Sequence, residues 1–208
     1  MVKTNSLHFQ YPGGELFNFP DIDLGAKEHL VILGPSGVGK TTLLHLLSGI
    51  LPANGGSIFI NDTEITSLDR KALDRFRGTH IGLIFQQYHF VRSLNVIENL
   101  QLRQYFPSKI KEKERRLAIA ERLGLADHLG KKVTQLSQGQ QQRLSIALGL
   151  IHKPMVVFAD EPTSNLDDAN CDKVLGLLKE EAKLCGSSLV IITHDQRVTE
   201  HFKNTIAL

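Results

Sequence analysis

The chain has 208 residues, of which 41% are hydrophobic and 22% charged, enough for one large domain with its own core. Its net charge of +2, its 6% aromatic content and its lack of tryptophan argue against a nucleic-acid partner. Two cysteines without CxxC spacing and an N-terminus without an apolar segment predict a reduced, cytoplasmic setting and no signal peptide. The longest apolar runs fall far short of the ~20 residues that a membrane span requires.

The first elements are expected to be strands. Residues 6–11 alternate between polar and apolar side chains and predict a strand, which a Pro-Gly-Gly turn follows. Residues 16–24 predict a second strand that pairs with the first in antiparallel fashion at the periphery, because Pro20 interrupts it. The short apolar run at residues 29–33 predicts a buried strand.

A phosphate-binding loop follows this buried strand. The segment fits the pattern G-x-x-x-x-G-K-[ST] and precedes a predicted helix at 41–51. Its glycines let backbone N–H groups surround phosphate oxygens, and the helix directs its positive end at the same anion. Lys40 is expected to reach the β- and γ-phosphates, and the Thr41 hydroxyl to bind Mg²⁺. The predicted nucleotide-binding residues of the loop are Gly34, Pro35, Ser36, Gly37, Val38, Gly39, Lys40, Thr41 and Thr42.

Strands and helices alternate along most of the remaining chain. Further strands are predicted at 57–61, 80–85, 155–159 and 188–193, with a short one at the end. Further helices are predicted at 68–76, 95–104, 110–123, 139–151 and 167–184. The second helix of the strand-poor stretch, at 110–123, carries many charges, which we interpret as a solvent-exposed face.

This order predicts an α/β fold with a mostly parallel sheet, helices on both faces and peripheral antiparallel strands. The strand-poor stretch at 87–135 is expected to be a helical subdomain. It would be inserted into a P-loop nucleotide-binding core formed by residues 1–86 and 136–208.

Polar side chains follow three of the predicted strands. Asp160 and Glu161 end the strand at 155–159, at the edge where ligands bind in open α/β sheets. We assign Asp160 to Mg²⁺ and expect the alternation of side chains along the strand to direct Glu161 elsewhere, toward an attacking water. Glu161 would then act as general base. Gln86 and His194 follow their strands in the same way. Gln86 is expected to reach Mg²⁺ or the water, and His194 to bind the γ-phosphate and the water.

The segment Leu136-Ser-Gln-Gly-Gln140 resembles the LSGGQ signature of ABC-transporter ATPases. The resemblance covers the whole chain, because the other motifs of the family follow in order. They are Tyr11, the P-loop at 34–42, Gln86, the signature, Asp160-Glu161, the segment 164–167 and His194. The stretches around the P-loop and at 159–167 are most similar to the branch that serves lipoprotein release, macrolide export and cell division.

The resemblance implies that two copies of the chain stack head to tail around two ATP molecules, each with Mg²⁺. Tyr11 would stack on adenine, and Asp167 would lie across the interface between the copies. A separate transmembrane permease would dock near residues 88–102, with Gln86 as the joint of the helical subdomain. The signature residues that would contact the partner's ATP are Ser137, Gln138, Gly139 and Gln140.

The implied function is ATP hydrolysis at the inner face of the cell membrane, powering export or extraction of a lipoprotein, peptide or drug. A regulatory ATPase that moves no substrate remains an alternative. A soluble DNA-repair ATPase is disfavoured, because no sustained heptads separate the P-loop from the signature. Two positions depart from the family pattern. Gln138 replaces a glycine, and Leu148 replaces a frequent arginine, which removes a possible surface ion pair.

Overall fold

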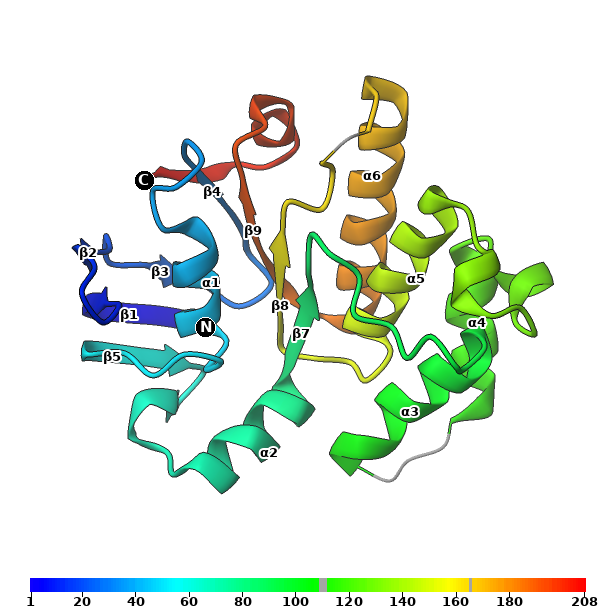
Figure 1. The fold of residues 1–208 in the computed structure, drawn as a ribbon, viewed down its shortest axis with the longest axis horizontal. Helices are drawn as coiled ribbons and strands as arrows, with labels where there is room; N and C mark the ends of the chain where they lie inside the picture. Colours follow the sequence, from blue (N-terminus) through cyan, green and yellow to red (C-terminus); the bar gives the residue numbers. More distant parts are fainter. Residues whose placement is uncertain (109–111, 165) are drawn as a thin grey trace.

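The computed structural model describes residues 1–108, 112–164 and 166–208, which form two β-sheets flanked by helices (Figure 1). The parallel sheet has the strand order β10-β4-β9-β8-β7, and all of its neighbouring strands run parallel. Its strands are β4 (His29–Leu33), β7 (Ile81–Ile84), β8 (Val156–Asp160), β9 (Ser188–Thr193) and β10 (Asn204–Ala207). The α/β fold class expected from the sequence is confirmed.

The second sheet is antiparallel and peripheral. It comprises β1 (Val2–Gln10), β2 (Leu16–Asn18), β3 (Asp23–Leu24), β5 (Gly55–Ile60) and β6 (Thr63–Glu64). The single strand predicted at 16–24 is wrong in extent, since it is divided into β2 and β3, which both pair with β1. Pro20 lies in the gap, where it has no ladder hydrogen bond to interrupt.

Strand β8 separates the two hydrophobic clusters of the core. Val156 and Phe158 face one cluster, whereas Val157 and Ala159 face the other, and all four are fully buried. This alternation explains why β8 is apolar throughout, as expected for a parallel strand that is covered on both faces.

The helices divide between these two clusters. Helix α1 (Lys40–Leu47) and the antiparallel sheet pack on the side of Phe158, and α2 (Arg70–His80) joins them at the edge. The opposite face is covered by the helices shown on the right of Figure 1. They are α3 (Val96–Ser108), α4 (Lys113–Arg122), α5 (Gln138–Leu150) and α6 (Asp168–Cys185). Short 3₁₀ helices are η1 (Ile65–Ser67), η2 (Ala126–His128), η3 (Val133–Gln135) and η4 (Gln196–His201).

Three helix ends differ from the prediction by four residues. Helix α2 continues to His80 instead of ending at residue 76, so the first residue of the strand predicted at 80–85 is helical. Helix α1 ends at Leu47 rather than at residue 51, because Gly49 takes a left-handed φ of 67°. Helix α3 continues to Ser108 instead of ending at residue 104, and Pro107 lies in its last turn. A proline there removes only one intrahelical hydrogen bond near the end of the helix. The start of the next predicted helix, at Ile110, lies outside the described residues.

The charged helix α4 is not simply a solvent-exposed face. Arg115 donates to the carbonyls of Leu150 and Ile151 at the end of α5. Arg116 is buried and donates to Gln104 at 2.8 Å, and Arg122 forms an ion pair with Glu181 of α6. These arginines tie α4 to its neighbours, which corrects the interpretation made from the charge pattern. Within the described residues, no helix combines the length and the apolar character that crossing a membrane would need.

Candidate functional site

The P-loop connects β4 to α1 and leaves its backbone N–H groups available. Gly39, the residue before α1, has a left-handed φ of 98°, and no side chain caps the helix. In the described structure, no hydrogen bond is donated by the N–H groups of residues 36–42. An α-helix with an unsatisfied first turn carries partial positive charge and favours an anion. This loop is therefore built to receive a phosphate group.

Lys40 adds a cation to the same place. Its side chain is buried, and its ammonium group donates to the carbonyls of Gly34 and Pro35, both at 2.8 Å. Among the described residues, Lys40 has no carboxylate within ion-pair distance. A buried cation held only by carbonyl oxygens is well placed to exchange them for an anionic ligand.

Thr41 and Asp160 meet at the carboxyl edge of the parallel sheet. The Thr41 hydroxyl donates to Asp160 Oδ2 at 3.0 Å, across a sequence separation of 119 residues. Burial raises the pKa of the Asp160 carboxyl above its ordinary value, and the hydrogen bond from Thr41 opposes this shift. A hydroxyl and a carboxylate at this distance form a pair of hard oxygen donors.

The side chains of Glu161 and Asp160 point in different directions, and the alternation of side chains along a strand is not the only cause. Strand β8 ends at Asp160, and Glu161 has a left-handed φ of 48°, which is uncommon outside glycine. Its buried carboxylate accepts hydrogen bonds from Thr193 Oγ1 at 2.8 Å and from the His194 backbone N–H at 3.1 Å. The His194 Nδ1 lies 2.7 Å from the same carboxylate. Glu161 therefore faces the end of β9, whereas Asp160 faces α1.

The Gln86 side chain shares a cavity with this pair. Gln86, Glu161 and His194 line a cavity of about 400 Å³, together with Thr163, Ser164 and residues 195–197. Three strand ends thus contribute to one hollow, as the order of β9, β8 and β7 in the sheet requires. A neutral His194 that donates from Nδ1 to Glu161 keeps Nε2 free to accept a hydrogen bond, and a protonated one can donate from both nitrogens.

Tyr11 lies beside the P-loop helix. Its hydroxyl is 3.2 Å from Thr42 Oγ1, and the residue is 41% exposed. Phe9 packs edge-on against Tyr11 at a centroid distance of 4.7 Å, and Phe17 does so at 6.4 Å. The ring thus has a fixed position and a solvent-exposed face next to the loop.

The signature segment forms the start of α5. The Ser137 hydroxyl accepts from the Gln140 N–H at 3.3 Å, and Gln140 Oε1 accepts from the Ser137 N–H at 2.9 Å. These reciprocal bonds are a capping box. Gln138 is exposed, and Gln140 Nε2 also contacts His128 at 2.7 Å. Within the described structure, no hydrogen bond joins residues 137–140 to the P-loop, and α1 and α5 pack on opposite faces of the sheet.

The comparison with known proteins identifies the family. A model of the ABC transporter family matches residues 18–164. The chain belongs to the ABC transporter family. It is an ATP-binding cassette and an ABC-type ATPase.

Relatives of this ABC cassette match it over its full length. The lipoprotein-releasing system ATP-binding protein LolD of Legionella pneumophila (strain Paris) is 35% identical over 100% of this chain and 94% of that protein. The macrolide export ATP-binding/permease protein MacB of Burkholderia thailandensis is also 35% identical over the whole chain, which spans only 33% of MacB. The dimeric post-hydrolysis structure of the cassette MJ0796, bound to ADP and Pi, superposes with a TM-score of 0.89 and 31% identity. That alignment covers 100% of this chain and 94% of MJ0796.

Asp167 caps α6 of the ABC cassette. Its carboxylate accepts from the Asn170 backbone N–H at 2.9 Å and from the Asn170 side chain at 3.0 Å, and the residue is exposed. Asn165, which belongs to the same motif, lies outside the described residues.

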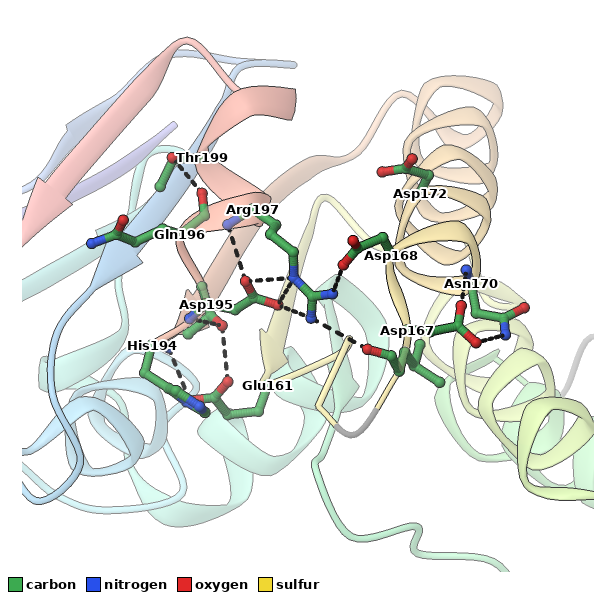
Figure 2. A network of polar contacts seen from close by, with 12 residues as sticks. Glu161, Asp167, Asp168, Asn170, Asp172, His194, Asp195, Gln196, Arg197 and Thr199 are labelled. Atoms are coloured by element: carbon green, nitrogen blue, oxygen red, sulfur yellow. Dashed lines mark hydrogen bonds and ion pairs between the residues drawn. The ribbon is translucent and has the colours of Figure 1, made fainter.

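The sequence reasoning missed Arg197. This residue contacts Asp195, Asp168 and the Leu166 carbonyl (Figure 2). The proximity of Asp195 and Arg197 in the sequence hints at a local ion pair, but nothing in the sequence links Arg197 to the start of α6.

Proposed function

We propose that this chain is the ATP-hydrolysing motor of a membrane complex that exports or extracts a lipoprotein, peptide or drug through a separate permease subunit. One observation carries the hydrolytic part of the proposal, namely the divergence of two adjacent carboxylates. Asp160 contacts Thr41 beside the P-loop, and Glu161 contacts His194 in the neighbouring cavity. One acid can therefore serve a metal while the other serves a water.

ATP would bind with its phosphates on the N–H groups of residues 36–42. Lys40 would leave its carbonyl partners for the β- and γ-phosphates, and Tyr11 would cover the adenine. Thr41 and Asp160 suit Mg²⁺, which prefers oxygen ligands and usually combines one or two carboxylates with substrate phosphates. Bound Mg²⁺ would neutralise charge on the transferred phosphoryl group.

Glu161 would accept a proton from the attacking water, and His194 would hold the γ-phosphate through Nε2. The contact between His194 Nδ1 and Glu161 orients both side chains. Gln86 lies in the same cavity, where its amide would help to position the water or the metal. In this arrangement the chain needs no nucleophile of its own, because positioning and charge stabilisation supply most of the catalysis of phosphoryl transfer.

A second copy would complete the site. Ser137, Gly139 and their neighbours would approach the γ-phosphate bound by the partner, and Asp167 would lie at the interface. The separation of α5 from the P-loop within one chain supports this proposal. The dimeric structure of MJ0796 with ADP and Pi also supports it.

The permease would dock at a largely apolar hollow between α2, α3 and β7, whose lining also includes the charged residues Asp74, Arg77 and Arg103. This cavity of about 400 Å³ is lined by Phe85, Phe90, Val91 and Leu102, which belong to or adjoin segment 88–102. Leu148 also lines this cavity. The position where the family often has arginine therefore adds to the apolar part of the cavity wall. We retain 87–135 as the helical subdomain that transmits the motion to the membrane. The fused permease of MacB supports such a partner.

Substitution of Glu161 tests the motor. We expect Glu161→Gln to retain ATP binding but to lose at least about 100-fold in turnover, the usual contribution of a general base. With ATP and Mg²⁺ it should accumulate as a dimer in size-exclusion chromatography with light scattering. Glu180→Gln, which removes an exposed carboxylate on α6 away from the cavity, is the control and should behave as the parent. Parental turnover in Glu161→Gln would refute the proposed role.

A further inference from the structure

Arg197 connects two segments that lie far apart in the sequence. It belongs to η4, directly after His194 and Asp195. Its Nε donates to both carboxylate oxygens of Asp195, at 2.9 and 3.0 Å, and its Nη2 donates to Asp195 Oδ2 at 2.7 Å. The same guanidinium forms an ion pair with Asp168 and donates to the Leu166 carbonyl at 3.3 Å (Figure 2).

The two contacts on the α6 side bracket Asp167. Leu166 precedes Asp167 and Asp168 follows it, so Arg197 binds both neighbours of this residue. The Asp167 carboxylate itself is bound by Asn170 and points away from Arg197 in Figure 2. The residues on both sides of Asp167 are thereby tied to Arg197, while Asp167 itself is exposed.

The other contact of Arg197 leads to the carboxylate of Glu161. The Asp195 N–H donates to Thr193 Oγ1 at 3.0 Å, and Thr193 Oγ1 donates to Glu161 Oε2 at 2.8 Å. His194 lies between Thr193 and Asp195 and contacts Glu161 directly. The Arg197 guanidinium also holds the pKa of the Asp195 carboxyl below its usual range, which keeps that group ionised. The contacts from Asp168 to Glu161 are therefore continuous.

We propose that Arg197 is a positioning residue that couples the start of α6 to the Glu161–His194 pair, so that docking of a second copy at Asp167 orients the hydrolytic site. The inference rests on the proposed function, because Asp167 contacts a second copy only when two copies stack around ATP. Arginine suits this task, since its planar fork binds several acceptors at once, whereas the ammonium of lysine is a single point charge.

The alternative is that Arg197 only adds stability. Its side chain is 40% exposed, and Asp168 is 86% exposed. Ion pairs of such exposed groups contribute little to folding. Removal of Arg197 should therefore lower turnover, through a displaced Glu161–His194 pair, while changing the melting temperature little. A positioning role and a stabilising role can thus be separated by experiment.

The test is a double-mutant cycle on ATP turnover with Arg197→Ala, Asp167→Ala and the double variant. We expect Arg197→Ala to lower kcat about 10-fold, within the loss of up to ~100-fold that a displaced catalytic group can cause. The affinity of the monomer for ATP, measured by calorimetry, should stay within about twofold, because Arg197 does not contact the P-loop. The double variant should be no slower than Asp167→Ala alone, since the two residues act through one linkage.

Three further variants serve as controls. Arg197→Lys should recover part of the lost kcat, and Asp168→Asn should lower kcat by a smaller factor, because it leaves the Asp195 pair intact. Arg122→Ala breaks another arginine–carboxylate pair, between α4 and α6, and should lower the melting temperature without the same loss of kcat.

Unchanged kcat in Arg197→Ala, or losses that multiply in the double variant, would overturn the inference. The same holds if Arg122→Ala and Arg197→Ala lose kcat and stability in parallel. These outcomes are distinct from failure of the proposed function, which would show as full turnover in Glu161→Gln.

Discussion

Helices α1 and α5 both begin in a glycine-containing segment, but their first turns are satisfied in different ways. At α5, Ser137 and Gln140 exchange hydrogen bonds and cap the helix from within the chain. At α1, Gly39 provides no side-chain cap, and the N–H groups of the loop are left for a ligand. The start of α5 is thus complete in the isolated chain, whereas the start of α1 requires an anion to become so.

The glycines at these two helix starts also differ in how strongly the fold of the chain requires them. A Cβ on Gly39 would lie 2.8 Å from Phe17 Cδ1, and its φ of 98° is unfavourable for other residues. A Cβ on Gly139 would meet only Arg143 Nη1, at 3.8 Å, and its backbone is helical. The fold of this chain therefore requires the glycine at 39 but not the one at 139. The missing side chain at 139 matters only to a molecule that approaches from outside.

The largest difference in stability should appear when each of these glycines is replaced by alanine. We expect Gly39→Ala to lower stability by about 1–3 kcal/mol from backbone strain alone, with a further loss from the contact with Phe17. Each kcal/mol corresponds to ~2–4 °C in Tm for a chain of this size. Gly139→Ala should leave Tm unchanged or raise it, by at most about 1 kcal/mol, because alanine is the better helix former.

ATP binding and dimerisation should also differ between Gly39→Ala and Gly139→Ala. Gly39→Ala should lose ATP binding by calorimetry, whereas Gly139→Ala should bind ATP as a monomer but fail to dimerise. Gly37→Ala is the matched control, since its φ is 88° but no atom lies within 4 Å of the added Cβ, so it should be less destabilised than Gly39→Ala. An equal loss of Tm for alanine at 39 and 139 would contradict the comparison.

A smaller effect is expected at the cap of α5. Ser137→Ala should lower stability by about 1 kcal/mol, because the Gln140 N–H loses its acceptor. Ser137→Asp should keep the cap and the Tm, since aspartate caps helices as well as serine does. Its negative charge should nevertheless repel the partner's phosphate and prevent ATP-dependent dimerisation. Thermal unfolding and light scattering measure the two properties separately, and a dimer of Ser137→Asp with ATP would refute the proposed contact.

The smallest change in stability should come from Asp160, beside the uncapped start of α1. Burial raises the pKa of its carboxyl above 3.8, so the folded state is favoured below this pH and loses that advantage as the pH rises through the folded-state pKa. At neutral pH Asp160→Asn should therefore raise Tm slightly, by less than the ~2–4 °C that corresponds to 1 kcal/mol, while its amide oxygen still accepts from Thr41. The increase should disappear at low pH, and Mg²⁺-dependent turnover should fall. A lower Tm at neutral pH would show that ionised Asp160 stabilises the fold.

Much of the fold was predictable because it follows local patterns. Strands β4 and β9 lie where the apolar runs predict them, with the same bounds at 29–33 and 188–193. Placement of Asp160 and Glu161 at one sheet edge follows from the parallel arrangement, in which all strands end on the same side. The break between β2 and β3 shows the limit, since proline signals an interruption without giving its length.

The sequence by itself determined the order of strands and helices, the phosphate loop and the acids that accompany it, because residue periodicity and motif spacing are properties of neighbouring positions. Only the tertiary structure decided which side chains meet across long separations. The left-handed turn at Glu161 directs its carboxylate to His194, and Arg197 reaches Asp168 across 29 residues. In the same way, arginines of α4 that look solvent-exposed in the sequence bind α5 and α6. Such contacts depend on how helices pack over the sheet, which no local pattern encodes.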